Sequence, residues 1–212
     1  MTSRGRPRNF DRTEALTAAM LLFWEKGYTA TSMADLYRVM GISSPSLYAA
    51  FGSKEDLYLA AIEHYAQQIA PHIWQPLEAA PTAREAVEAW LIRSAETLTR
   101  DGFPPGCMVT LSGVASEGND RLGEVVIRSR YQGLQLLTAR LKRGVATGEL
   151  PPETDVATLA RLYVSLQQGM SLQARDGAGS KVLKQVARLA MHLWPETASQ
   201  EECRTFPENL RA

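Results

Sequence analysis

The sequence contains little of the chemistry that catalysis and metal binding require. Among 212 residues there are three histidines and two cysteines. We find no Gly-x-Ser-x-Gly motif, no Glu-x-x-His pair at metal spacing and no phosphate-binding glycine motif. Because a catalyst needs a placed nucleophile, a base and a group that stabilises charge, the sequence predicts no enzyme, no metal site and no cofactor.

Long hydrophobic runs and disulfide-forming cysteines are also scarce. No apolar run approaches the ~20 residues that span a bilayer, and no hydrophobic segment follows the basic, polar N-terminus. We therefore expect neither a membrane partner nor secretion. Cys107 and Cys203 are too few for a disulfide framework and are typical of a reducing cytoplasm. An apolar content of 45% and a charged content of 22% are those of a globular protein.

Residues 31–54 have the pattern of two short helices joined by a tight turn. Thr31 and Ser32 are candidate caps before an apolar face at helical spacing. Gly41 stands where the first helix must end, because glycine adopts the left-handed conformation at little cost. Leu47 and Phe51 are four residues apart in the second helix and can pack on the first.

The second of these helices presents small polar side chains on its outer face. Ser43 can cap it and Pro45 falls in its first turn, which leaves Ser44, Ser46 and Tyr48 pointing outward. Small side chains let a backbone approach DNA bases, and hydroxyls at a helix N-terminus offer donors to phosphates. The pattern favours a helix-turn-helix that reads DNA over an ordinary helical hairpin packed in a core.

Between residues 11 and 61, three motifs follow in order without a gap: Gly27-Tyr28-x-x-Thr31-Ser32-Met33-x-x-Leu36, Met40-Gly41-Ile42-Ser43 and Leu47-Tyr48-x-x-Phe51-x-Ser53-Lys54-Glu55-x-Leu57. In these motifs the chain resembles the N-terminal domain of TetR/AcrR-family transcriptional regulators. Ala50 departs from the family, which often carries an aromatic residue or histidine there. The resemblance implies a DNA-binding domain in which Lys54 contacts phosphate.

The expected DNA contacts fall into two groups. Contacts to bases or near bases are expected from the start of the second helix, at Ser44, Pro45 and Ser46, and Ser43 before them is also expected to contact DNA. Contacts to phosphates are expected from Thr31, Ser32, Tyr48 and Lys54.

The N-terminal arm supplies a local positive charge to a chain whose formal net charge is zero. Residues 1–12 hold four arginines against the single acid Asp11, which gives +3. We expect Arg4, Arg6 and Arg8 to be disordered in the free protein and to order on DNA, in the minor groove or on the backbone.

The rest of the chain is predicted to be helical, which gives an all-α protein. Caps and apolar spacing predict helices over about 11–26, from residue 54 with breaks at Pro71 and Pro76, and over about 83–100, 119–143, 154–175 and 180–194. The apolar segment 107–115 fits a short buried helix, with a strand as the alternative. We expect a DNA-binding domain at 1–53, a ligand-binding and dimerisation domain at 54–195, and a mobile tail at 196–212.

The last two predicted helices are apolar over more than one stripe, which suggests a second, intermolecular surface. The family resemblance likewise implies a homodimer through a four-helix interface. Aromatic, methionine and polar residues on inward helix faces are candidates for an effector pocket, although such residues also form ordinary cores. These candidates are His64, Trp74, Trp90, Met108, Tyr163, Gln167 and Met170.

Cys107 follows Pro-Pro-Gly and is expected near a helix N-terminus, where the dipole favours a thiolate. This Gly-Cys start is similar to a TetR subgroup that includes an electrophile-sensing repressor. Cys107 is therefore either a thiol sensor within the effector site or a small residue packed in a core.

Taken together, the sequence predicts a homodimeric transcriptional repressor whose partners are operator DNA, a small-molecule effector and a second copy of itself. A thiol-based repressor acting through Cys107 is the alternative. A helical interaction module without specific DNA binding is a third interpretation.

Overall fold

The computed structural model describes residues 10–196, and every regular element in this range is a helix, which confirms the all-α prediction. The α-helices are α1 (Arg12–Lys26), α2 (Met33–Met40), α3 (Ser44–Phe51), α4 (Lys54–Gln68), α5 (Ala70–Trp74), α6 (Pro76–Ala79), α7 (Ala83–Leu98), α8 (Asp120–Ala146), α9 (Val156–Arg175) and α10 (Ser180–Ala190). A 3₁₀ turn over Met191–Leu193 follows α10.

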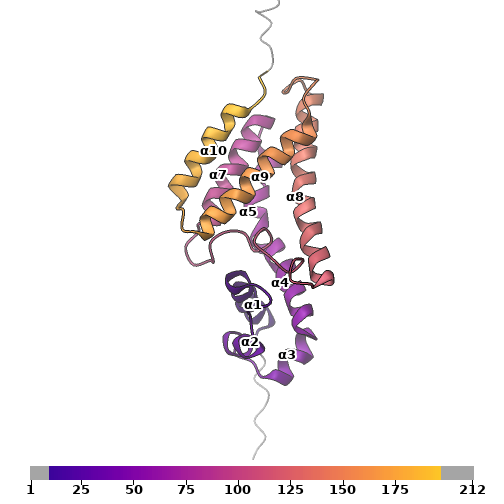
Figure 1. The fold of residues 1–212 in the computed structure, drawn as a ribbon, viewed down its shortest axis with the longest axis vertical. Helices are drawn as coiled ribbons and strands as arrows, with labels where there is room; N and C mark the ends of the chain where they lie inside the picture. Colours follow the sequence, from indigo (N-terminus) through magenta and orange to yellow (C-terminus); the bar gives the residue numbers. More distant parts are fainter. Residues whose placement is uncertain (1–9, 197–212) are drawn as a thin grey trace, which may run out of the picture.

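The molecule is elongated, with two parts connected by α4 (Figure 1). At one end, α1 to α3 form a small head (residues 10–53). At the other, α5 to α10 form a larger body (residues 70–196). The helix α4 packs along α1 in the head and continues into α5 of the body. A change in the body can therefore reach the head along one continuous helix.

The helix-turn-helix forms from local signals that are each visible in the sequence. The Ser32 hydroxyl accepts from the backbone N–H of Asp35 at 3.0 Å, and the Asp35 carboxylate accepts from the backbone N–H of Ser32, so α2 begins with a capping box. Gly41 ends α2 at φ +65°, in the left-handed region. Buried Ile42 and Leu47 then fix α3 against the head's core.

The helix α4 begins and ends where the sequence indicates. Ser53 and Asp56 form a second capping box, with the Asp56 backbone N–H donating to the Ser53 hydroxyl at 3.0 Å. Pro71 and Pro76 lie in the first turns of α5 and α6, where proline is tolerated. The chain after α4 is thus broken into short helices, as the two prolines predict.

The segment 107–119 is a series of turns, and the helix predicted over 107–115 is wrong. The guanidinium of Arg130 on α8 binds two carbonyls that such a helix would use, those of Val109 and Thr110, and a third at Ser112. Its Nε donates to Val109 O at 3.1 Å, and its Nη2 donates to Thr110 O at 3.0 Å and to Ser112 O at 2.6 Å. A further small difference is that Gly179, and not Ser180, is the N-cap of α10.

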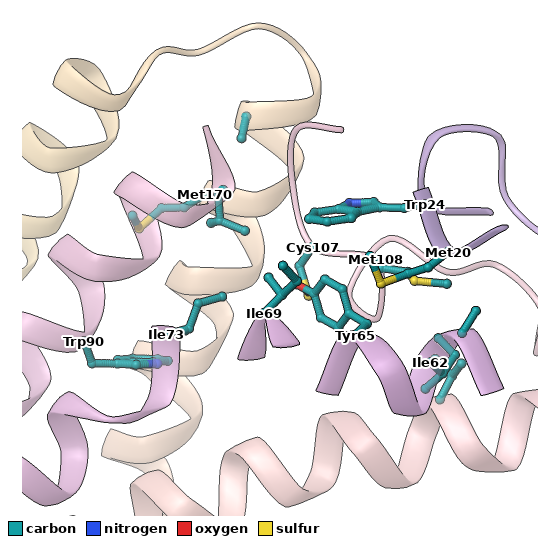
Figure 2. Packing of buried hydrophobic residues seen from close by; sticks show 14 of the residues in the cluster. Met20, Trp24, Ile62, Tyr65, Ile69, Ile73, Trp90, Cys107, Met108 and Met170 are labelled. Atoms are coloured by element: carbon teal, nitrogen blue, oxygen red, sulfur yellow. The ribbon is translucent and has the colours of Figure 1, made fainter. Parts of the chain in front are cut away.

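A continuous apolar core runs from the head through α4 into the body, where α7 is its most deeply buried helix. Trp90 of α7 is fully buried, and its ring lies 5.4 Å from that of Trp74 on α5. Figure 2 shows this core around Tyr65 and Cys107. None of the helices in residues 10–196 combines the length and apolar character needed to cross a membrane.

Candidate DNA-binding surface and effector cavity

The N-terminal end of α3 carries a small hydroxyl-rich surface at the end of the head. Ser43 and Pro45 are exposed, and Ser44 and Ser46 are half-buried. The Ser43 and Ser46 hydroxyls share a hydrogen bond of 2.9 Å, and Ser44 shares one of 2.9 Å with the hydroxyl of Tyr37 on α2. Ser43 is the N-cap by position, but its side chain makes no cap bond to the backbone. The hydroxyls are therefore held in place by one another and by Tyr37, and the Ser43 hydroxyl is not used to cap the backbone of α3.

Thr31 and Ser32 differ in what they can offer to DNA. Ser32 is exposed, although its hydroxyl is engaged with Asp35. Thr31 is completely buried, and its hydroxyl donates to the carbonyl of Gly27 at 2.6 Å. This bond closes the loop after α1, so Thr31 presents no group to a phosphate and we remove it from the expected contacts.

Two residues flank the reading helix with groups suited to phosphate. Tyr48 is 51% exposed on α3. Lys54 opens α4, and its ammonium lies over the ring of Tyr28, 4.3 Å from the ring centre. Burial lowers the pKa of Lys54, and the charge of Glu117 opposes that shift. A cation positioned by an aromatic face at a helix N-terminus is well placed for a phosphate.

Arg4, Arg6 and Arg8 lie outside the described residues, so their role on DNA stays a prediction. Arg12, the first residue of α1, is described, and its guanidinium lies 4.7 Å from the ring centre of Phe51 on α3. This places a further cation beside the reading helix, a role that the sequence reasoning did not assign to it.

A polar cluster joins the start of α4 to the N-terminal end of α8. Arg121 donates to Asp56 at 2.7 Å and to Glu55 at 3.4 Å, and the Asn119 side chain donates to Glu55 at 3.0 Å. Hydrogen bonds from Ser53 and then from Arg121 hold the pKa of Asp56 below its usual value. Further along α4, the hydroxyls of Tyr58 and Ser112 are 2.8 Å apart. The segment 107–121 is thus attached to α4 at several levels.

Arg175 makes a second link between head and body. From the end of α9 it donates to the carbonyls of Trp24 at 2.8 Å and Glu25 at 3.0 Å, near the end of α1. Its Nε also donates to Pro105 O at 2.9 Å. A cation bound to the last carbonyls of a helix complements that helix's dipole. One side chain therefore connects α1, α9 and the loop that precedes Cys107.

A cavity of about 320 Å³ lies in the body against the C-terminal half of α4. Its walls are mainly apolar and come from α4, α5, α8, α9 and the segment 107–110. Its largest apolar side chains are Trp74, Ile73, Val109, Leu136 and Val164. An apolar cavity of this size with a few polar groups is typical of a small-molecule site.

Cys107 lies on the wall of this cavity and contacts α4 and α9. Its thiol sulfur accepts from the hydroxyl of Tyr65 at 3.3 Å (Figure 2), and its backbone N–H donates to the Ser171 hydroxyl at 2.8 Å. Burial, and then the neighbouring thiol, raise the pKa of Tyr65 well above its usual value. Within residues 10–196, no three histidine, cysteine or acidic side chains gather to hold a metal ion.

The structure separates the eight predicted effector-site residues into two groups. Trp74, Cys107 and Gln167 line the cavity. The other five pack elsewhere: His64 is hydrogen-bonded to Thr17 of α1 at 2.9 Å, and the rest are buried core residues. These buried residues are Trp90, Met108, Tyr163 and Met170.

Several cavity residues were not predicted, among them Tyr65, Arg130 and Gln168. Tyr65 carried a usable signal, because a tyrosine among the buried positions of a helix needs a partner for its hydroxyl. Arg130 carried none, since its three carbonyl partners depend on how segment 107–112 folds back on α8.

The exposed helix-turn-helix and the helical body define a DNA-binding transcriptional regulator. The family model for bacterial regulatory proteins of the tetR family matches residues 15–61, and the tetracyclin repressor-like C-terminal domain matches residues 81–190. The chain therefore belongs to the TetR family of transcriptional regulators, whose members are DNA-binding proteins and not enzymes.

Relatives that are described as transcriptional repressors agree with this assignment. The chain is 36% identical to the HTH-type transcriptional repressor ComR of Escherichia coli (strain K12) over 197 residues, 92% of this chain and 93% of ComR. It is 38% identical over 112 residues to the repressor BdcR of the same strain, 53% of this chain and 56% of BdcR. A cysteine mutant of the TetR-family regulator CifR, complexed with 26-bp operator DNA, matches with TM-score 0.84 and 39% identity, covering 90% of this chain and all of CifR.

Proposed function

We propose that this chain is a repressor that binds a pseudo-palindromic operator as a two-fold homodimer and releases it when a small molecule enters the cavity against α4. The observation that carries the proposal is the position of α4. Its first residue, Lys54, adjoins the reading helix, and Tyr65 near its other end forms part of the cavity wall. CifR, a relative at 39% identity, is described in complex with operator DNA.

In this proposal each α3 enters a major groove. Ser43, Ser44, Pro45 and Ser46 approach the bases, and Ser32, Tyr48 and Lys54 contact phosphates. The arginine arm adds affinity that depends little on sequence. The two half-sites lie about one helical turn, ~34–36 Å, apart or somewhat further.

The homodimer is proposed to form through α9 and α10. One stripe of α10 is buried against the body at Leu183, Ala187 and Ala190. A second apolar stripe faces outward on α10 and on the 3₁₀ turn after it, and includes Leu189 and Leu193, which are 71% and 60% exposed. On α9, Leu162 and Leu172 are also exposed. Adjacent helices with this much exposed apolar surface are typical of an interface between copies of a chain.

Release is proposed to follow from displacement of α4 and of the segment attached to it. A molecule in the cavity contacts Tyr65, and the attachments at Ser112, Asn119 and Arg121 carry any shift of segment 107–121 to the start of α4. A coupling free energy of ~1–3 kcal/mol between effector and DNA is typical. We keep the division into a DNA-binding domain at 1–53 and an effector and dimer domain at 54–195.

The position of Cys107 favours a second candidate, a thiol-based repressor. The sulfur lines the cavity and accepts a hydrogen bond from Tyr65 on the helix that carries the head. An electrophile that forms a bond to this sulfur releases the thiol proton and places a substituent between α4 and α9. Either effector chemistry then acts on the same helix.

A gel-shift experiment with the DNA upstream of the chain's own coding sequence tests the proposal. We expect a salt-sensitive complex with a specific inverted repeat, which competitor DNA of random sequence does not displace. Absence of any sequence preference would instead support the helical interaction module.

A further inference from the structure

Gln167 of α9 is a buried amide that faces the cavity without a partner. Its side chain lies on the cavity wall and the residue is 5% exposed. In residues 10–196 we find no hydrogen bond to its carboxamide from a side chain or the backbone. Because no protein group pairs with this amide and it lines the cavity, a ligand with a complementary polar group can form a hydrogen bond to it.

Gln167 also lies close to the middle of the site. On α9 it precedes Ser171 by four residues, so both side chains project from the same face, about 6 Å apart along the helix axis. The Ser171 hydroxyl accepts the backbone N–H of Cys107. A ligand atom bound to Gln167 therefore lies near Cys107 and Tyr65, the contact point with α4.

The charges around the cavity argue against ionic ligands. Its described lining contains no acidic side chain and one cation, Arg130. The Nε and Nη2 of Arg130 already donate to three carbonyls of segment 109–112. A carboxylate would have to compete with those bonds, and an ammonium ion would enter without a counter-charge, both at a desolvation cost.

Two hydroxyls on the cavity wall already have partners. The Tyr65 hydroxyl donates to Cys107, and the Ser129 hydroxyl donates to the carbonyl of Val125 at 2.9 Å. An apolar cavity of about 150 Å³ binds benzene, so a cavity of 320 Å³ has room for roughly ten non-hydrogen atoms. Its aromatic and aliphatic walls suit a ring.

We propose that the cavity selects uncharged, mainly apolar molecules of about ten non-hydrogen atoms that carry one carbonyl or amide group, and that Gln167 is the residue that recognises this group. That such molecules release DNA rests on the proposed function, whereas their binding to the cavity does not depend on it.

Four probes with the same number of non-hydrogen atoms test the selectivity on the full chain: acetophenone, isopropylbenzene, benzoate and 2-phenylethylammonium. Dissociation constants are measured by ligand-observed NMR without DNA, where affinities in the millimolar range are expected for molecules of this size. We expect acetophenone to bind at least about tenfold more tightly than either ion, because of the charge cost.

The variant Gln167→Leu is expected to lose about tenfold in affinity for acetophenone and to gain affinity for isopropylbenzene, because the apolar side chain leaves no amide unpaired. Gln173→Leu, at an exposed position on α9 outside the cavity lining, is the matched control and should leave both affinities unchanged. The reversal between the two neutral probes also separates recognition from a loss of folding, which would weaken both.

The inference is overturned if no probe binds, if an ion binds as tightly as acetophenone, or if Gln167→Leu leaves the preference for acetophenone unchanged. If acetophenone binds as expected but fails to release DNA in the gel shift, the selectivity stands and the proposed regulation by such molecules fails.

Discussion

At the scale of single residues, the reading surface is defined by hydroxyl groups that hold each other in place. Ser43 pairs with Ser46, and Ser44 pairs with Tyr37 of the preceding helix. Each hydroxyl has a donor and two acceptor positions, so one such bond leaves capacity for a base edge or a phosphate. The hydroxyls at the N-terminal end of α3 are thus already held in position in the protein without DNA.

The variant Lys54→Gln is expected to weaken DNA binding almost equally on all sequences. The ammonium over Tyr28 is proposed to neutralise a phosphate, so its loss should reduce the slope of log K against log salt by about one for each protomer. Fluorescence anisotropy over a salt series measures this slope. An unchanged slope would remove Lys54 from the phosphate contacts, and Lys142→Gln, at an exposed position on α8, is the control.

The variant Cys107→Ser is expected to bind operator DNA normally and to resist release by N-ethylmaleimide. The thiol adds across the reagent's double bond, with sulfur bonding to one carbon and the proton going to the other. The new group lies beside Tyr65 and Ser171, where we expect it to displace α4. Cys203→Ser should still be released, which makes it the matched control. Release of Cys107→Ser at the normal reagent concentration would leave Cys107 as a packing residue.

Residue roles were predictable from sequence where they depend on local order. The caps at Ser32 and Ser53 and the turn at Gly41 follow from neighbours within four positions. Thr31 was misplaced because its partner, the Gly27 carbonyl, depends on how the loop after α1 closes. His64 was misplaced because its partner, Thr17, lies on another helix.

At the scale of elements, the loop before Cys107 depends on two glycines with positive φ. Gly106 and Gly102 have φ of +84° and +81°. A Cβ at Gly106 would lie 2.8 Å from the carbonyl oxygen of Ser171, whereas nothing lies within 4 Å of one at Gly102. The two positions therefore share backbone strain but differ in packing.

Gly102→Ala is expected to lower the free energy of unfolding by about 1–2 kcal/mol, the cost of the left-handed conformation. Gly106→Ala should cost clearly more, because the loop must also move away from α9. Chemical denaturation measures both values. Equal losses would contradict the close packing of this loop on α9.

Arg175→Gln is expected to loosen two segments that are far apart in the sequence. It removes the bonds to Trp24, Glu25 and Pro105 and should lower the free energy of unfolding by about 1–3 kcal/mol. Hydrogen–deuterium exchange should accelerate at the end of α1 and in residues 101–107 together. Exchange that changes in only one segment would mean that Arg175 does not link them, and Arg128→Gln on α8 is the control.

Most helices were predictable from caps and apolar spacing, including α8, with its N-cap at Asn119, and α9, with its cap at Asp155. The turns over 107–119 were not, although the segment is apolar enough for a helix. Its carbonyls are taken by Arg130, twenty residues away in sequence. A local pattern contains no information about such a partner.

At the scale of the whole molecule, a shift of α4 can change the distance between two heads only if the bodies of two copies are fixed relative to one another. The outward stripe of α10 is the surface proposed for that contact, and Leu189 is its most exposed member. A glutamate there would be buried without a partner in a dimer, which is costly. Loss of the dimer should then prevent two α3 helices from binding the two half-sites of one operator together.

Selection of binding sites from random-sequence duplex DNA, followed by footprinting, is the most direct test of the two-fold reading of DNA by α3. We predict that the wild-type chain enriches an inverted repeat with half-sites about 34–36 Å apart or somewhat further, and that Leu189→Glu fails to enrich it while Ile127→Glu on α8 succeeds. Enrichment of a single unrepeated site, or of no sequence at all, would contradict the account.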